Sequence, residues 1–376
     1  MKYWRGYLVA AILAACTWGF RELASTHSKL VDMIYPYVTR MVQNYLAGWS
    51  GAVDFCVWQA VLLGLLVAAF ASVVLMIIFR WNPIQWFGWI LSVASLIVLL
   101  HTGIFGMNEF AGPIAEDMRL PEAEFSQTQI EEAAVYYRDK ANELAATVAR
   151  NSDGTVKLPE LAQLNEQAAN GFKHLVYDEY YSVFAGSTAP VKELGMADYF
   201  TQKGKMGLTV AITGEAAVNM QAPSVMIPYA ICREMCYRMC IATKPDTAYA
   251  AFMACQANED PQFQYAGYVM AYQYLLNALP DTAAKTVAAH ANAQLREDVQ
   301  IWEDFVVKGI TEESAQENAQ VYEDVAKLLV SWHYQQVVLP SITEPEVQFD
   351  PMDETLVDLT TTPHIISSTD ATEDAA

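Results

Sequence analysis

Two uninterrupted apolar stretches limit what this chain can fold into more than any other feature does. Residues 57–79 and 84–105 contain no Asp, Glu, Lys or Arg. Each reaches the roughly 20 residues that an α-helix needs to cross a bilayer. Only the short segment 80–83, which includes Pro83, separates them. The sequence therefore predicts two membrane spans joined as a helical hairpin.

A third apolar stretch, residues 6–20, is shorter and can be interpreted in more than one way. Lys2 and Arg5 before it fit a signal peptide, and the residues up to Cys16 look like a lipoprotein processing site. Apolar residues continue past Cys16 to Phe20, so we favour a span. Residues 1–105 are then a membrane anchor with spans at about 6–20, 57–79 and 84–105.

The orientation of this anchor is only weakly encoded by the positively charged residues of its short loops. The two sides carry three each: Lys2, Arg5 and Arg80 against Arg21, Lys29 and Arg40. The pair at the N-terminus favours a start inside the cell. Three spans then place everything after residue 105 outside the membrane.

Residues 106–339 have mostly helical periodicity and are expected to form one mainly α-helical domain with a small β element. Ser126 is a candidate N-cap, and the stretch 207–219 has the composition of a strand. Residues 185–206 are expected to be a loop. Further helices are expected from Pro159 onwards and at 226–242, 246–257, 262–279, 282–308 and 315–337.

The charge of the chain is strongly acidic, with 43 Asp and Glu against 22 Lys and Arg. This balance excludes nucleic acid as a partner, because phosphate binding needs a surface of cations. Residues 340–376 contain nine of the acidic residues and no Lys or Arg. We expect this segment to be a disordered acidic tail that acts as a solvated spacer.

Three cysteines recur at every fourth position in the segment ICREMCYRMC, residues 231–240. On a helix such neighbours have Cβ atoms about 5–6 Å apart, which is wider than the roughly 3.5–4.5 Å of a disulfide. A bond between Cys232 and Cys255 is feasible outside the cell. A cysteine metal site is disfavoured, because there is no second cysteine pair and no nearby histidine. The alternative is that all of these thiols are simply buried.

Four segments around these cysteines resemble a family of bacterial membrane proteins of unknown function. They are, in order, TGEAAVN (213–219), VMIPYAICREMCYRMCIA (225–242), DTAYAAFMACQ (246–256) and QYAGYVMAYQYLLNAL (264–279). That family has three N-terminal spans and a domain similar to HExxH zinc metallopeptidases. Its motif helix reads approximately I-C-H-E-x-A-H-Q. The resemblance extends over about residues 1–337 and implies a zincin-like domain.

The resemblance also implies that this chain has lost its zinc. The two histidine positions are occupied by Arg233 and Tyr237, whereas Glu234 keeps the position of the general base. Asp246 takes the place of the third ligand. Arginine has no lone pair to offer a metal, and tyrosine is a poor ligand unless it is ionised. A catalytic zinc normally has three protein ligands, so we expect no metal, no cofactor and no peptidase activity. We expect Arg233 to pair with Glu234 or Asp246.

These observations favour a membrane-anchored pseudo-metallopeptidase that binds a peptide or protein outside the bacterial cytoplasmic membrane. Residues 208–213 are expected to be an edge strand that can bind a peptide. Glu215 and Asn219 either line the cleft or only close a tight turn. One alternative is a zinc-dependent hydrolase with a non-standard site, using Asp246 with Cys236 or Cys240. Another is a structural subunit of a membrane complex. Membrane lipid is expected as a partner in every case.

Overall fold

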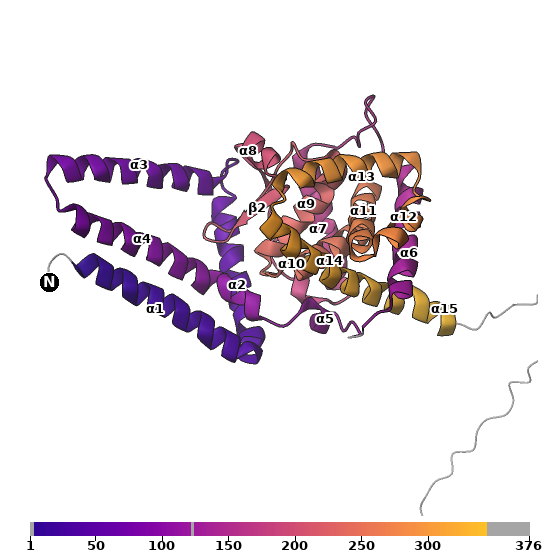
Figure 1. The fold of residues 1–376 in the computed structure, drawn as a ribbon, viewed down its shortest axis with the longest axis horizontal. Helices are drawn as coiled ribbons and strands as arrows, with labels where there is room; N and C mark the ends of the chain where they lie inside the picture. Colours follow the sequence, from indigo (N-terminus) through magenta and orange to yellow (C-terminus); the bar gives the residue numbers. More distant parts are fainter. Residues whose placement is uncertain (1–3, 122–123, 344–376) are drawn as a thin grey trace, which may run out of the picture.

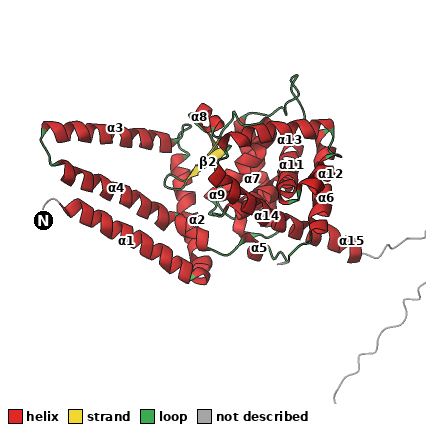
Figure 2. Cartoon of the chain, viewed as in Figure 1, coloured by secondary structure: helices red, strands yellow, loops and turns green. Residues whose placement is uncertain are grey.

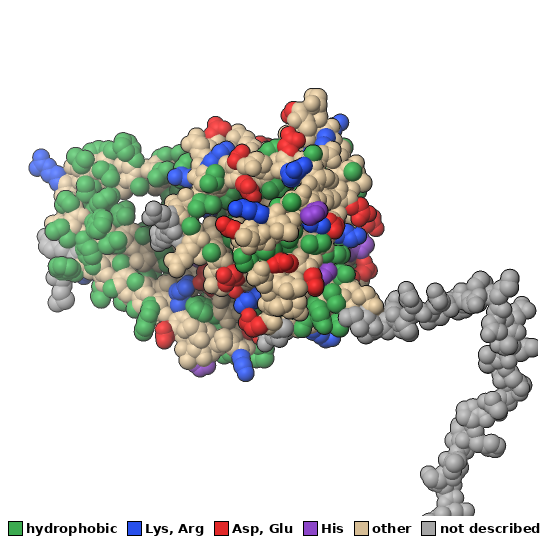
Figure 3. Space-filling model, turned by 45° about the vertical axis from the view of Figure 1, so that its right-hand side comes forward, with side chains coloured by type: hydrophobic (Ala, Val, Ile, Leu, Met, Phe, Trp, Pro, Cys, Tyr) green, Lys and Arg blue, Asp and Glu red, His purple; other side chains and the backbone are tan. Residues whose placement is uncertain are grey.

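The computed structural model describes residues 4–121 and 124–343, and it confirms a mainly helical chain. Three helices are long and apolar enough to cross a membrane: α1 (Arg5–Thr26), α3 (Val57–Ile78) and α4 (Pro83–Ile104). They lie together at one side of a helical domain (Figure 1). In the space-filling view apolar side chains gather over these helices, whereas charged ones gather on the domain (Figure 3).

Helices α1 and α4 pack closely, whereas α3 buries none of its residues. Gly6 and Gly88 permit this close packing, because a Cβ on Gly6 would lie 2.5 Å from the carbonyl carbon of Gly88. The hydroxyl of Ser92 donates a hydrogen bond to the carbonyl of Gly6 at 2.7 Å. Small residues with a hydroxyl bridge are typical of helix pairs in membranes.

Helix α2 (Ser28–Ser50) was not expected from the sequence, and it lies across the ends of α1, α3 and α4 (Figure 1). Its buried side packs on the domain, where Gln43 Nε2 donates to the carbonyl of Ala211 at 3.0 Å. Arg40 Nε donates to the carbonyl of Met239 at 3.0 Å. Its opposite side exposes large apolar residues three or four positions apart: Leu30, Met33, Ile34, Tyr37, Val38, Met41, Tyr45 and Trp49.

The domain consists of helices of moderate length around a buried centre (Figure 2). At this centre lie α9 (Ile227–Arg238), α10 (Lys244–Gln256) and α11 (Pro261–Ala278), most of whose residues are buried. The helices around them are α5 (Ile114–Asp117), α6 (Gln127–Ala145), α7 (Leu161–Tyr177), α8 (Ala197–Gln202), α12 (Asp281–Ala288), α13 (Ala293–Val306), α14 (Glu312–His333) and α15 (Leu339–Thr343).

Two helix ends show how the sequence sets these boundaries. Ser126 caps α6, as the sequence predicted, and it also forms a capping box with Gln129. The predicted helix 282–308 is interrupted instead, because Asn292 caps α13 and its backbone amide bonds to Asn142 of α6. Of the predicted acidic tail, residues 340–343 belong to α15, and residues 344–376 lie outside the described residues.

A small three-stranded sheet lies between α2 and α9, in the order β1–β3–β2. Strands β2 (Gly207–Val210) and β3 (Glu215–Val218) form an antiparallel hairpin within the predicted extended stretch. Strand β1 (Lys192–Glu193) pairs in parallel with β3 and falls in the segment predicted as loop. The hairpin turn needs Gly214, which has a φ of +66° and whose Cβ would lie 2.6 Å from the backbone nitrogen of Ala47 in α2.

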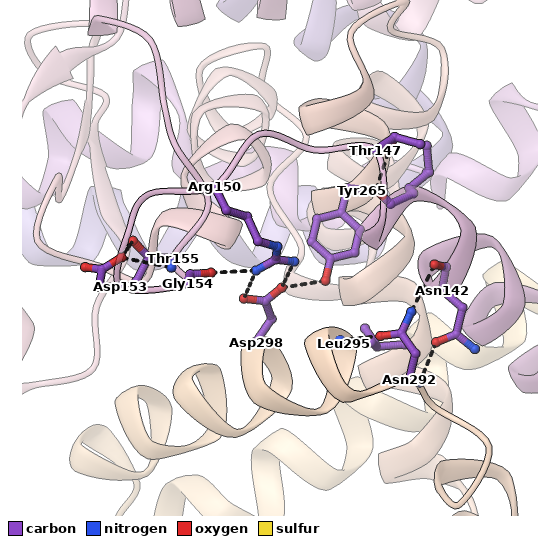
Figure 4. A network of polar contacts seen from close by, with 11 residues as sticks. Asn142, Thr147, Arg150, Asp153, Gly154, Thr155, Tyr265, Asn292, Leu295 and Asp298 are labelled. Carbon is purple, nitrogen blue, oxygen red and sulfur yellow. Dashed lines mark hydrogen bonds and ion pairs between the residues drawn. The ribbon is translucent and has the colours of Figure 1, made fainter.

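A buried polar network joins three parts of the domain far from the sheet (Figure 4). Arg150 binds Asp298 of α13 through both carboxylate oxygens, at 3.2 and 2.7 Å. The phenol of Tyr265 in α11 donates to the same carboxylate at 2.6 Å, and Arg150 also donates to the carbonyl of Gly154. Every oxygen of this buried carboxylate is therefore paired, so the network holds the 150–156 turn, α11 and α13 together.

Candidate functional site

A cleft of about 360 Å³ opens beside α9, the helix that contains the cysteine-rich segment 231–240. Arg233 and Tyr237 lie four residues apart and both line it, as neighbours on one helical face do. Cys232 and Cys236 point the other way and are fully buried. The cleft is completed by the segment 203–206 and by residues of α10, α11, α13 and α14, among them Lys244, Ala248, Met270, Gln273, Tyr274, Trp302, Glu317 and Tyr322.

Glu234 is held from two sides and is only 1% exposed. Arg233 Nη2 lies 2.9 Å from its Oε1, and the hydroxyl of Thr209 in β2 donates to its Oε2 at 2.8 Å. Glu234 and Asp246 were the two carboxylates expected as partners for Arg233, and Glu234 is the one that pairs with it. Strand β2 comes this close because residue 207 is glycine, whose Cβ would lie 2.7 Å from Cγ of Glu234.

The pKa shifts in α9 keep Arg233 positively charged and keep Tyr237 a neutral phenol. Burial alone would lower the pKa of Arg233, but the carboxylate of Glu234, together with the nearby phenols of Tyr237, Tyr229 and Tyr274, leaves that pKa raised. Burial raises the pKa of Tyr237, and the nearby Arg233 cation offsets only part of that increase. The guanidinium has no lone pair to offer a metal, and a neutral phenol is a poor metal ligand. The residues at the two positions where the resemblance places histidines therefore do not fit zinc.

Asp246 does not join this cleft, which corrects the position inferred from the resemblance. It lies in the first turn of α10, where its Oδ2 is 2.6 Å from the hydroxyl of Thr243, the N-cap residue. The amide of Ile114 donates to its other oxygen at 3.4 Å. These contacts turn the carboxylate away from Arg233. Helix α10 lines the cleft with Ala248 and with one charged residue, Lys244, which lies one helical turn before it.

Asp246 instead lines a smaller pocket of about 160 Å³ between α2 and the domain. Cys240, Asp32 and Asp117 also line it, and so does Arg40. Burial raises the pKa of both Asp246 and Cys240, which favours their protonated forms and opposes metal binding. Among the described residues no three His, Cys, Asp or Glu side chains are placed to hold a metal ion. Cys236, the other thiol considered for a non-standard zinc site, lies in the core.

The disulfide that was feasible between Cys232 and Cys255 is not formed in the structure, and all six cysteines are free thiols. The two residues are nevertheless neighbours in the core, between α9 and α10. Burial raises the pKa of Cys255, and a hydrogen bond with Cys232 raises it further. These thiols are therefore packed apolar groups, as the alternative interpretation of the cysteines had it.

Glu215 does not line the cleft either. Its carboxylate instead binds the first backbone amides of α3. It is 2% exposed, and its carboxylate accepts hydrogen bonds from the backbone amides of Val57 and Trp58, both at 2.7 Å. Lys192 Nζ lies 2.8 Å from Glu215 Oε1 and also donates to the carbonyls of Ser50 and Phe55. The predicted cleft residue is thus a cap on the N-terminus of an apolar helix.

Asn219, the other predicted cleft residue, is fully buried behind one wall of the cleft. Its side-chain amide donates to the carbonyl of Lys205 at 3.0 Å and to the hydroxyl of Thr201 at 2.9 Å. It therefore positions the segment 203–206 without lining the cleft. Sequence reasoning missed Lys203, Lys205, Lys244 and Glu317, because they come from separate segments without a motif and only the fold brings them together.

The arrangement defines a mainly α-helical protein with three apolar helices and a cleft beside the buried helix α9. Over residues 31–328 the chain matches the family described as "Protein of unknown function (DUF3810)", and it belongs to that family. No curated protein and no solved structure matches the chain.

Proposed function

We propose that this protein is a membrane-anchored pseudo-metallopeptidase whose domain binds polypeptide without cleaving it. The observation that carries this proposal is the Arg233–Glu234 ion pair. A zinc peptidase needs a carboxylate that is free to take a proton from a metal-bound water. Here the corresponding carboxylate is engaged by a permanent cation and by Thr209.

The ion pair has a physical reason within this proposal. A glutamate that is 1% exposed is costly to bury unless an opposite charge or a metal lies beside it. Arg233 supplies this charge from the position where the resemblance places a metal ligand. The arginine thereby replaces the metal as the structural partner of Glu234, and the helix keeps its fold without zinc.

Two features support polypeptide as the ligand. Strand β2 is an edge strand, since it pairs only with β3 in the sheet. Lys205 and Met206, directly before this strand, line the cleft. An extended segment in the cleft could continue along the strand edge with main-chain hydrogen bonds, which is a common way to bind peptides.

We further propose that α1, α3 and α4 cross the cytoplasmic membrane, with the N-terminus inside and the domain outside. Helix α2 supports a membrane location beside the domain, because it packs on the domain by one side and exposes an apolar stripe on the other. A helix of this kind lies in a membrane interface, where Tyr37, Tyr45 and Trp49 are favourable residues. The bilayer would then cover the stripe.

The test is a peptide-cleavage assay on the full chain in lipid nanodiscs with added zinc. A mixed peptide library is followed by mass spectrometry, and Glu234→Gln serves as the matched variant. We expect no products above those of this variant. Cleavage by the wild-type chain that Glu234→Gln abolishes would contradict the proposal and favour a zinc-dependent hydrolase with a non-standard site.

A further inference from the structure

The cleft beside α9 differs in charge from the rest of this acidic chain. Four cations line it, and they are Lys203, Lys205, Arg233 and Lys244. Glu317 is the single carboxylate among the lining residues, and it is paired with Lys244 at 2.6 Å. Lys203 and Lys205 form no ion pair with the described residues. In a chain with 43 acidic and 22 basic residues, this cleft is therefore a local positive site.

Two buried hydrogen-bond donors point to the chemistry of a ligand. Gln273 is 3% exposed and lines the cleft, and its Nε2 has no partner among the described residues. Arg233 Nε is likewise buried without a partner, although another nitrogen of the same guanidinium binds Glu234. An unpaired buried donor is costly, so both nitrogens favour a ligand with acceptor oxygens.

We propose that the cleft binds carboxylates of an acidic polypeptide segment, and that this segment is the chain's own residues 344–376. The segment contains nine Asp and Glu and no Lys or Arg, which complements Lys203 and Lys205, the two cations of the cleft outside the Arg233–Glu234 and Lys244–Glu317 ion pairs. This inference rests on the proposed function, and it names the ligand of the same cleft. A ligand outside the chain would have to displace the tail.

The connection between tail and cleft is short enough for this contact. Helix α14 lines the cleft near its N-terminal end, up to Tyr322, and the described chain ends at Thr343. These 21 positions are helical, so at a rise of about 1.5 Å per residue they span about 30 Å. The 33 residues that follow extend up to about 110 Å. A tether of this length also raises the effective concentration of the tail at the cleft to about the millimolar range.

The experiment measures binding of a fluorescent peptide of residues 344–376 to the full chain in nanodiscs. One variant keeps the length of the tail and replaces its nine carboxylates by amides. We expect the peptide to bind this neutral-tail variant at least about 10-fold more tightly than the wild-type chain, whose own tail competes. Higher salt should weaken the binding, because screening reduces attraction between exposed charges.

Two charge variants locate the site within the neutral-tail background. Lys203→Gln with Lys205→Gln should weaken peptide binding about 10-fold. Lys173→Gln with Lys285→Gln removes the same charge from exposed positions outside the cleft and should leave binding unchanged. Gln273→Met tests the buried donor and should also weaken binding. No binding, or equal effects of the two lysine pairs, would overturn the proposed cleft site.

A third result separates the two parts of the proposal. If the peptide binds the wild-type and neutral-tail chains equally, and still depends on Lys203 and Lys205, the cleft binds acidic polypeptide but the tail is not its occupant. That result overturns the assignment to residues 344–376. None of these readouts involves zinc or cleavage, so failure of the ligand assignment is distinguishable from failure of the pseudoenzyme proposal.

Discussion

Glu215 and Lys192 form a buried ion pair, with 2.8 Å between Oε1 and Nζ, at the point where the helical domain meets α3. The same carboxylate caps the first two residues of α3, and the same ammonium group binds carbonyls of the segment before that helix. Helix α3 buries none of its residues. The pair therefore joins the start of α3 to the domain, beside the packing of Trp58 near Leu194 and Ala217.

Replacing Glu215 by Gln should lower the stability of the chain markedly. The substitution leaves the ammonium group of Lys192 buried without its counter-charge, and losing one partner of a buried pair typically costs about 3–5 kcal/mol. Thermal unfolding in nanodiscs measures the effect, with Glu193→Gln as an exposed control. Because Glu215 does not line the cleft, peptide binding at a permissive temperature should be unchanged. A loss of binding without a loss of stability would contradict the assigned role.

Placing histidines at both positions, with Arg233→His and Tyr237→His, should create zinc affinity that we do not expect of the wild-type chain. Histidines at i and i+4 on one helical face can bind one zinc ion together. Adding Lys244→Glu should strengthen the binding, because residue 244 lines the same cleft. Zinc titration calorimetry on the variants measures this effect.

The same variants test whether position 244 or Asp246 can supply a third zinc ligand. Asp246→Ala in the double-histidine background should leave zinc affinity unchanged, because Thr243 and Ile114 hold this carboxylate away from the cleft. If Asp246→Ala weakened zinc binding and Lys244→Glu had no effect, the position inferred from the resemblance would be correct and the geometry described above would be wrong.

His333 should make the domain less stable at mildly acidic pH. Burial lowers its pKa below the ordinary 6.5, and Glu132 offsets only part of this shift. The ring lies 4.7 Å from that of Tyr136. Below about pH 6.5 the unfolded chain gains a proton here that the folded chain does not, so the unfolding free energy falls until the pH reaches the folded pKa. His333→Gln should flatten this dependence.

Thermal melts between pH 7.5 and 5.5 measure the effect of His333, and His290→Gln is the matched control at an exposed histidine. The control should keep the slope of the wild-type chain. An unchanged slope in His333→Gln would show that another group is responsible.

The apolar stripe of α2 should lie in lipid. A spin label at Met41→Cys, in a Cys16→Ser background because Cys16 is the exposed cysteine, should collide more with oxygen than with a water-soluble nickel chelate. Oxygen concentrates in the bilayer, whereas the chelate stays in water. A label at the exposed Tyr177 of α7 should show the opposite preference. Nickel-dominated collisions at Met41 would place the stripe in water.

The sequence predicted the fold where local patterns decide it. Uncharged apolar length identified α3 and α4, and the Ser126 cap identified the start of α6. It did not predict α2, whose one side packs on the domain while the other stays exposed, with Pro36 inside the helix. The two-residue strand β1 is also invisible in a local pattern, because only its pairing with β3 defines it.

The site was predicted less completely, because it depends on which way each side chain points. Arg233 and Tyr237 could be placed together from helical spacing alone. Glu215 and Asp246 were misplaced, because their partners at Val57 and Ile114 are more than 130 positions away in the sequence. Lys203 and Lys205 belong to no motif, and their relation to Arg233 exists only in the folded chain.

The most direct test of the central claim is the metal content of the full chain, purified in nanodiscs, exposed to zinc and dialysed. Elemental mass spectrometry gives the zinc per chain, and the double-histidine variant is the positive control. The account predicts no stoichiometric zinc in the wild-type chain, because Arg233 stands where the resemblance places a ligand and already pairs with Glu234. One tightly held zinc ion per wild-type chain would contradict it.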